Sequence, residues 1–514
     1  MNGAQALVQT LLSSGVEACF ANPGTSEMHF VAALDQSVGM KCTLGLHENV
    51  VTGMADGYFR VARKPACTLL HCGPGLANGL ANLHNARRAS SGIVNIVGDQ
   101  ATYHRQYDAP LTSDTESLAR AVSGWVCTSS DAADVGADAA RAVQAANAQG
   151  GQVATLILPS DASWSEGGIV VSPLLPIAPA PIEAEALEAC AALLRSGKKV
   201  LILLGGNALT ADCQEAAWRI AKASNATILA EYSPALVARG CGRPQLERIP
   251  YSIDLAVERL KSFEGLITVN AKAPVSFFAY PGKPSVQYAP GTQIASLSDQ
   301  GQDPLQALHA LADELRAPVV SMPDPGPRPL AARGAITSEG VAQTLAALMP
   351  ENAIVSDESI SFGRNFYPFS HAAPPHDWLH LTGGAIGDGL PVATGAAIAA
   401  GGRRRVISLQ ADGSALYTVQ ALWTQAREKL PCTTIILSNR KYNILIGEYK
   451  NVGAKPGQTA MSMLDLSDPN ISWVSIAKGF GVEAASASSL EELADLLAHS
   501  FSLDAPFVIE LQIF

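Results

Sequence analysis

The most specific chemical pattern in the chain pairs a short acidic segment with a distant amide side chain. Asp412, Gly413 and Ser414 follow an apolar stretch, and Asn439 follows another one, with 25 residues between Gly413 and Asn439. Both stretches are typical of buried strands, so these polar residues are expected at the carboxyl ends of parallel strands, where open α/β sheets bind ligands. A carboxylate and an amide oxygen suit a hard divalent cation, and a glycine lets the backbone approach a phosphate. The pattern therefore predicts a metal and phosphate site.

Two other segments could do chemistry but are ambiguous when they are taken alone. Glu48 lies at the start of an expected helix, where a glutamate is usually a cap or a partner of the helix dipole. The glycine-rich segment around Ile386 could equally be an ordinary helix entry with Ile386 in the core. A further helix is expected over residues 416–430, and its N-terminus would favour a phosphate beside Gly413.

The elements that must position these residues form three blocks, in each of which short apolar stretches alternate with helical ones. Strands that are apolar on both faces and alternate with helices predict an α/β fold with mainly parallel sheets. We therefore expect three consecutive α/β domains at residues 1–171, 187–317 and 335–514. A proline-rich stretch at residues 172–186 predicts an extended linker, and a second one at residues 318–329 closes the middle block.

The expected strands are defined by their apolar stretches. They lie at residues 16–22, 66–73, 92–99 and 153–159 of the first block, 198–206, 226–232, 264–272 and 292–298 of the second, and 353–358, 405–412, 432–439 and 505–514 of the third.

Composition limits the partners and the location of the chain. Its 514 residues exceed what one hydrophobic core supports, and a formal net charge of −11 argues against nucleic acid or an anionic membrane as a partner. No run of 18 apolar residues occurs, and no lysine or arginine precedes the first apolar stretch, so neither a membrane span nor a signal peptide is expected. The nine cysteines form no CxxC pair, which argues against a zinc site or a disulfide framework. These features predict a cytoplasmic protein with free thiols.

Beside these features, the chain resembles the thiamine-diphosphate enzymes of the acetolactate synthase and pyruvate decarboxylase superfamily. Members carry Gly-Asp-Gly, then about two dozen residues, then Asn, which Ala411-Asp412-Gly413 and Asn439 match except at Ala411. The resemblance implies Mg²⁺, with Ca²⁺ as a substitute, bound by the side chains of Asp412 and Asn439 and by the carbonyl of Lys441. It also implies hydrogen bonds from Ser414 and Tyr442 to the diphosphate.

The resemblance extends to the first block and assigns the ambiguous segments. It implies that Glu48 hydrogen-bonds N1′ of the aminopyrimidine and thereby activates the cofactor. Gly384 would accept a hydrogen bond from the 4′-amino group, and Ile386 would support the bent cofactor from below. The first domain would be the pyrimidine-binding domain and the third the diphosphate-binding domain. Because these two domains come from different subunits in the family, the resemblance implies a homodimer as the smallest active unit, with tetramers common.

Within the superfamily, the resemblance is strongest to the benzoylformate decarboxylases. Asn22-Pro-Gly-Thr-Ser-Glu27 looks like their substrate-binding segment, so Thr25 would contact a substrate carboxylate and His71 would be an active-site histidine. A hydroxyl and an imidazole could bind a 2-oxo acid and move protons. The second catalytic histidine of those enzymes has no equivalent in residues 273–280, where Phe278 or Ala279 occupies its place and Tyr280 is the nearest polar group.

Three functions follow from the resemblance. The first is a lyase that decarboxylates a small-molecule 2-oxo acid, with or without carboligation to an aldehyde. The second is an acetolactate-synthase-like carboligase, although Gly205-Gly206 lacks the G-x-G-x-x-G spacing and FAD is therefore not expected. The third is a weakly active paralogue with a regulatory role, which Ala411 and the absent histidine would favour.

Overall fold

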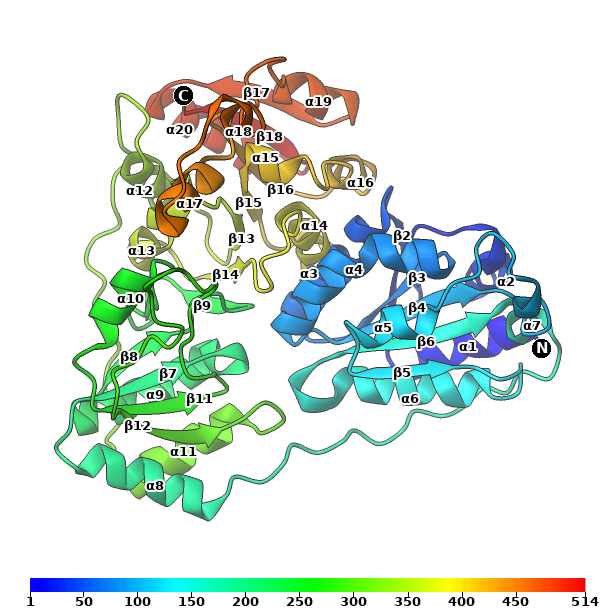
Figure 1. Cartoon of the computed structure of the whole chain (residues 1–514), viewed down its shortest axis with the longest axis horizontal. Helices are drawn as coiled ribbons and strands as arrows, with labels where there is room; N and C mark the ends of the chain where they lie inside the picture. The colour runs from blue at the N-terminus through cyan, green and yellow to red at the C-terminus, as the bar shows by residue number, and fades with distance from the viewer. Residues whose placement is uncertain (514) are drawn as a thin grey trace.

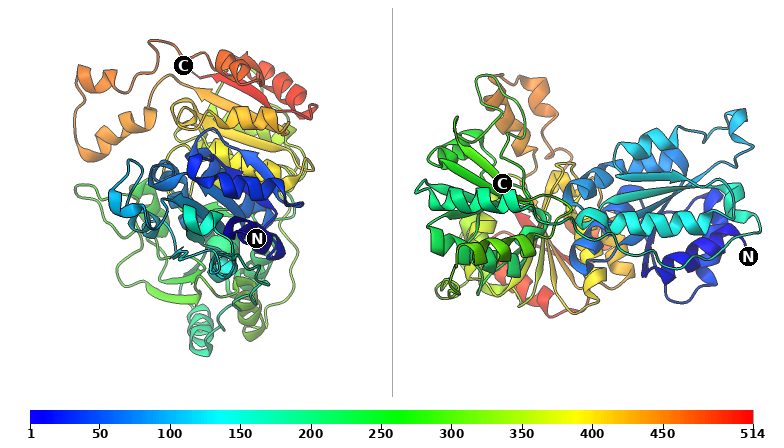
Figure 2. Two further views of the ribbon diagram at one scale, coloured as in Figure 1. Left: turned by 90° about the vertical axis from the view of Figure 1, so that its right-hand side faces the viewer. Right: turned by 90° about the horizontal axis from the view of Figure 1, so that it is seen from below.

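Three mainly parallel sheets, each covered by helices, make up the computed structural model, which describes residues 1–513 (Figure 1). The expected α/β class with mainly parallel sheets is confirmed. The first sheet lies apart from the other two, which are close together, and the right-hand view of Figure 2 shows the same division. No helix in the described residues is long and apolar enough to cross a membrane.

The first sheet has six parallel strands in the order β2-β1-β3-β4-β6-β5. Its strands are β1 (Ala18–Ala21), β2 (Lys41–Leu44), β3 (Ala66–Leu70), β4 (Ile93–Asp99), β5 (Trp125–Thr128) and β6 (Val153–Pro159). Its helices are α1 (Gly3–Ser13), α2 (Met28–Asp35), α3 (Glu48–Ala62), α4 (Cys72–Ala89), α5 (Thr115–Arg120), α6 (Val135–Asn147) and α7 (Ser160–Trp164).

The middle sheet has five parallel strands in the order β10-β8-β7-β11-β12. Its strands are β7 (Val200–Leu204), β8 (Thr227–Ala230), β10 (Glu247–Arg248), β11 (Gly265–Val269) and β12 (Gln293–Ser298). Its helices are α8 (Ala184–Arg195), α9 (Ala211–Ser224), α10 (Ile253–Leu260) and α11 (Pro304–Glu314). The proline-rich residues before α8 run as a long extended connection from the first domain (Figure 1).

The third sheet has seven strands in the order β17-β18-β16-β15-β13-β14-β9. Its strands are β9 (Val237–Arg239), β13 (Ile354–Glu358), β14 (His376–His380), β15 (Val406–Ala411), β16 (Cys432–Ser438), β17 (Glu483–Ala487) and β18 (Phe507–Gln512). Its helices are α12 (Ser338–Leu348), α13 (Phe366–Phe369), α14 (Gly389–Ala400), α15 (Asp412–Ala415), α16 (Ala421–Arg427), α17 (Asn443–Val452), α18 (Gln458–Ser462), α19 (Trp473–Gly479) and α20 (Leu490–Phe501).

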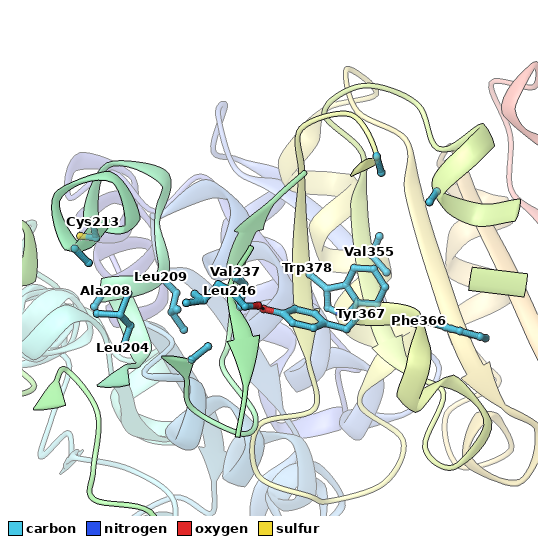
Figure 3. Packing of buried hydrophobic residues seen from close by; sticks show 14 of the residues in the cluster. Leu204, Ala208, Leu209, Cys213, Val237, Leu246, Val355, Phe366, Tyr367 and Trp378 are labelled. Carbon is cyan, nitrogen blue, oxygen red and sulfur yellow. The ribbon is translucent and has the colours of Figure 1, made fainter. Parts of the chain in front are cut away.

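Strand β9 comes from the expected middle domain but pairs antiparallel with β14 of the third sheet. Behind this pairing the hydrophobic cores of the two domains are continuous, with Val237 and Leu246 facing Tyr367 and Trp378 (Figure 3). The guanidinium of Arg239 stacks over the Tyr367 ring at 3.5 Å. The middle and third domains are therefore fixed to each other through a shared core.

The first and third domains meet where α3 packs along α14. A Cβ atom added to Gly57 of α3 would collide with the backbone of Val392, and one added to Gly395 of α14 would collide with the backbone of Met54. Glycine at both positions therefore allows the two helices to approach closely. The close packing of α3 against α14 holds α3, whose first residue is Glu48, in a fixed position.

The prediction of a single helix over residues 416–430 is wrong. Only the one-turn helix α15 and the later helix α16 form, and residues 416–420 between them are not helical. Thr418 lies in this break, and its hydroxyl donates to the carbonyl of Gly387 at 3.0 Å. Because α15 is a single turn, the argument that a long helix N-terminus favours a phosphate beside Gly413 does not apply.

Candidate active site

Asp412 and Asn439 lie side by side, as the sequence pattern predicted. Strands β15 and β16 pair in parallel with Ala411 opposite Leu437, so both residues follow the carboxyl ends of neighbouring strands. The carboxylate of Asp412 is 3% exposed and accepts from the backbone N–H groups of Gly413 at 2.9 Å and Arg440 at 2.6 Å. We call residues 412–414 and 439–442 together the clamp.

The clamp has the properties expected of a cation and phosphate site. Burial raises the pKa of Asp412, and among residues 1–513 no ion pair offsets the cost of its charge. A bound divalent cation would offset it. A Cβ atom added to Gly413 would lie 2.5 Å from the Tyr442 ring, so glycine allows Tyr442 to lie directly over this backbone. The side chains present therefore fit Mg²⁺ and a diphosphate.

Ala411, the one departure from the family motif, has ordinary backbone geometry. Its φ is −70° and its ψ is 142°, which is extended backbone that any L-residue adopts. A methyl group at this position therefore requires no left-handed conformation.

The segment 382–389, which we call the cofactor loop, is held by helix α4 of the first domain. The side chain of Asn85 donates to the carbonyl of Ala385 at 2.8 Å and accepts from its N–H at 3.1 Å. Asn82 donates to the carbonyl of Gly387 at 3.0 Å, and Nε2 of His84 lies 3.1 Å from the carbonyl of Gly383. These contacts anchor every second residue of the loop.

Gly384 and Ile386 lie between the anchored residues. Gly384 has a φ of +79°, and a Cβ atom added there would lie 2.6 Å from the Phe277 ring, so both backbone and space require glycine. Ile386 is half-buried. Gly384 and Ile386 as contacts of the cofactor stay predictions.

Glu358, at the end of β13, supports the cofactor loop from the other side. Its carboxylate accepts from the N–H groups of Gly387 at 2.7 Å and Gly389 at 2.8 Å. Burial raises the pKa of Glu358 to about 7, although these N–H groups act in the opposite direction. The cofactor loop is thus held by a carboxyl group whose pKa is raised. The sequence did not indicate this role for Glu358.

In the first domain, the side chains of Glu48 and His71 lie close to each other. Glu48 is the first residue of α3, and its carboxylate accepts from Nδ2 of Asn78 on α4 at 3.1 Å. A Cβ atom added to Gly75 would be 3.3 Å from the His71 Cβ and 3.6 Å from Oε1 of Glu48. Both side chains therefore border the same small space, which supports a shared role.

Glu27 completes this group and was not singled out from the sequence. It is 1% exposed, and its Oε2 lies 2.9 Å from Nδ1 of His71. Ser26 lies between them, with its hydroxyl 3.1 Å from the same nitrogen, while Thr25 is exposed at the start of the turn. Ligand atoms of Glu27, His71 and Cys72 lie within 4.8 Å of one another, but Glu27 and His71 already hydrogen-bond each other. We therefore interpret the group as a hydrogen-bonded acid–imidazole pair.

Comparison with known proteins identifies the first and third domains. The N-terminal TPP binding domain of thiamine pyrophosphate enzymes matches residues 1–119, and the C-terminal TPP binding domain matches residues 362–511. The chain is also 30% identical to benzoylformate decarboxylase of Pseudomonas aeruginosa, over 98% of this chain and 97% of that one. The chain belongs to the thiamine pyrophosphate enzyme family.

Other relatives in the family carry different names. A Mycobacterium tuberculosis protein, provisionally named an acetolactate synthase large subunit, is 48% identical over 99% of both chains. In fold, the chain is similar to the thiamine diphosphate-dependent 4-hydroxybenzoylformate decarboxylase of Rhodococcus jostii, with a TM-score of 0.86 at 24% identity, covering 100% of this chain and 99% of that one. Membership of the family supports thiamine diphosphate as the cofactor and leaves decarboxylation and carboligation as alternatives.

The two groups of predicted site residues lie in different domains of one chain, with Thr25, Glu48 and His71 in the first domain and the clamp in the third. No hydrogen bond or ion pair within residues 1–513 joins Thr25, Glu48 or His71 to the clamp. Helix α4 contacts Glu48 through Asn78 and the cofactor loop through Asn85.

Proposed function

We propose that the chain is a thiamine-diphosphate- and Mg²⁺-dependent carbon–carbon lyase that removes carbon dioxide from a 2-oxo acid without oxidation. The observation that carries this proposal is that the carboxylate of Glu48 lies close to the hydrogen-bonded pair of Glu27 and His71. It combines a carboxylate suited to the cofactor with an imidazole suited to proton transfer. The 30% identity to a benzoylformate decarboxylase over nearly the full length supports the choice of reaction.

The third domain would hold the cofactor. Asp412, Asn439 and the carbonyl of Lys441 would bind Mg²⁺, and Ser414 and Tyr442 would hydrogen-bond the diphosphate. Gly384 and Ile386 would set the position of the aminopyrimidine. When bound, the cofactor supplies a nucleophilic carbon and takes up the electron pair that carbon dioxide leaves behind.

The first domain would handle protons. Glu48 would hold a proton at N1′ of the aminopyrimidine, and its low exposure keeps water from competing for this contact. Thr25 would donate a hydrogen bond to the substrate carboxylate. Glu27 binds Nδ1 of His71 and thereby orients the ring, which leaves Nε2 to move a proton to or from the substrate.

We further propose that two copies of the chain share each site, so that a homodimer is the smallest active unit and a tetramer is compatible with it. The separation of Glu48 from the clamp within one chain supports this arrangement. Mixing Glu48→Ala subunits with Asp412→Ala subunits tests it, since sites that combine the intact halves should regain activity. If the two variants exchange subunits and the mixture still has no activity, sites shared between two subunits are contradicted.

An acetolactate-synthase-like carboligase is the second candidate, because the relative at 48% identity has that provisional name. Incubating the holoenzyme with a panel of 2-oxo acids, with and without aldehydes, separates the candidates through carbon dioxide release and product analysis. Release without an acceptor supports the lyase, whereas release and product only with a second 2-oxo acid supports the carboligase. Bound cofactor with no turnover of any acid would contradict both and favour a regulatory paralogue.

A further inference from the structure

A cavity of about 340 Å³ lies between the middle and third domains, beside the residues assigned to the cofactor. Phe277 forms one wall, and its ring also lies against Gly384 of the cofactor loop. Asn443 forms another wall and directly follows Tyr442 of the clamp. The cavity therefore borders both parts of the predicted cofactor site, and its volume suits the side chain of a small ligand.

Three aromatic rings lie in the wall of this cavity, beside polar lining residues. Tyr251 and Phe277 pack with their ring centroids 5.9 Å apart, and Tyr280 continues the aromatic group through Phe278. Flat apolar rings of this kind give contact area to a carbon chain or an aryl group. They do not by themselves distinguish one substrate from another.

Most of the charged groups that line the cavity already have partners. Lys283 lies 2.6 Å from Oδ1 of Asp254, so these two charges compensate each other. Glu448 accepts from the Tyr280 hydroxyl at 2.6 Å and from Asn451 at 3.2 Å. Burial and the neighbouring Glu448 raise the pKa of Tyr280, which keeps its hydroxyl protonated as a donor.

Arg364 differs from these groups. It lines the cavity and stacks over the Tyr251 ring at 5.0 Å, but among residues 1–513 it forms no ion pair. Stacking fixes the plane of a guanidinium and leaves its edge donors available, and that edge matches the two oxygens of a carboxylate. The cavity thus combines aromatic rings in a partly polar lining with one oriented cation, Arg364, and one carboxylate, Glu448, whose hydrogen-bond partners are neutral.

We propose, on the basis of the decarboxylase function above, that this cavity receives the side chain of the 2-oxo acid and that Arg364 selects a side chain ending in a second carboxylate. The aromatic walls would contact the methylene groups, and Arg364 would bind the distal carboxylate. In the reaction, the bond between the ketone carbon and the adjacent carboxylate breaks, carbon dioxide leaves, and a proton takes its place. The product is an aldehyde that keeps the distal carboxylate.

Two acids of equal chain length test this selection. The holoenzyme should decarboxylate 2-oxopentanedioate with a kcat/KM about tenfold or more above that for 2-oxopentanoate. Arg364→Gln should lower this ratio by about 10- to 100-fold, mainly through the KM of the dicarboxylate. Glu448→Gln, which keeps an acceptor for Tyr280 and removes a negative charge, should raise the ratio.

A matched control comes from an arginine outside the cavity. Arg427 also stacks on an aromatic ring, Trp423 at 5.2 Å, so Arg427→Gln removes the same kind of group and should leave the ratio unchanged. A native enzyme that prefers 2-oxopentanoate, or a ratio that Arg364→Gln does not change, would overturn the selection by Arg364.

Binding separates this inference from the proposed function. If the native holoenzyme releases carbon dioxide from no acid, the decarboxylase function fails, and calorimetry with pentanedioate still reports on the cavity. Weaker binding of pentanedioate to Arg364→Gln than to the native chain and to Arg427→Gln supports the cation as the anion site. Equal binding to all three, or no binding to the native chain, contradicts it.

Discussion

Asn85 exchanges two hydrogen bonds with the backbone of Ala385, a residue 300 positions away in the chain. The contact joins helix α4 of the first domain to the cofactor loop of the third domain. Asn78 and Asn82 share a face of the same helix with Asn85, because residues four and seven positions apart project to one side. One face of α4 therefore fixes Glu48 through Asn78 and the cofactor loop through Asn82 and Asn85.

Replacing Asn85 with alanine should weaken the cofactor site more than the fold. The backbone N–H and carbonyl of Ala385 would lose their partner, at a cost of about 1–3 kcal/mol in the free energy of unfolding. Because Gly384 and Ile386 flank Ala385, thiamine diphosphate should bind about tenfold more weakly, measured by calorimetry. Asn147→Ala is the control, since Asn147 bonds only within its own helix region. Equal cofactor affinity in both variants would contradict a positioning role for Asn85.

Replacing Glu48 with alanine should leave the cofactor bound while slowing its activation. In the proposed site, Glu48 would act on the aminopyrimidine, whereas the clamp would supply most of the binding. Exchange of the cofactor C2 proton for deuterium should slow by about 100- to 10,000-fold, followed by NMR after acid quenching. Glu17→Ala, at an exposed glutamate of the same domain, is the control. Unchanged exchange or turnover in Glu48→Ala would remove Glu48 from the mechanism.

The strands that carry the clamp could be predicted because each is apolar on both faces and ends in a polar residue. The expected ranges 405–412 and 432–439 correspond to β15 and β16. Strand β9 could not be predicted in the same way, because its three residues carry no periodic pattern and its partner β14 lies far along the chain. Its place depends on the core shared with Trp378, which only the tertiary structure shows.

The site shows the same limit. Glu27 belongs to the segment that resembles the decarboxylases, but its role depends on a contact with His71, 44 residues away. The asparagines of α4 have helical spacing, and on sequence alone such a polar stripe is typical of a solvated face. Asn82 and Asn85 are instead buried against the third domain. Local pattern identified the residues that resemble family motifs, whereas the residues that position them are defined by long-range contacts.

Replacing His71 with alanine should lower kcat by about 100- to 10,000-fold, because the proposed reaction would lose its proton-transfer group. Glu27→Gln should have a smaller effect on kcat, since the amide oxygen can still contact Nδ1 while the charge that orients the ring is lost. Added imidazole should restore part of the activity of His71→Ala and none of that of Glu48→Ala. Full activity in His71→Ala without imidazole would contradict the assignment.

Glu358 should make the stability of the cofactor-free chain depend on pH. Its pKa in the folded chain is about 7, compared with an ordinary value of 4.5, so the fold favours the protonated carboxyl. This contribution is complete below about pH 4.5 and is lost as the pH rises to about 7, by about 3 kcal/mol in the free energy of unfolding. Glutamine stays neutral, so the difference in unfolding free energy between the native chain and Glu358→Gln should fall over this pH range in urea titrations. The exposed replacement Glu185→Gln is the control, and a difference that stays constant with pH would contradict the shifted pKa.

Asp412 should connect cofactor binding to the metal ion. Its buried carboxylate has no ion-pair partner among the described residues, and Mg²⁺ would supply one. Removing divalent ions with a chelator should therefore weaken thiamine diphosphate binding by the native chain, and Mg²⁺ should restore it. Asp412→Asn should bind the cofactor about 100-fold more weakly or worse, with little response to Mg²⁺. Ala411→Gly is the matched control, because the extended backbone at Ala411 already accommodates the methyl group and the variant should bind like the native chain. Cofactor affinity in the native chain that does not respond to the chelator would contradict the metal site, and a large gain in affinity in Ala411→Gly would show that the methyl group obstructs the diphosphate.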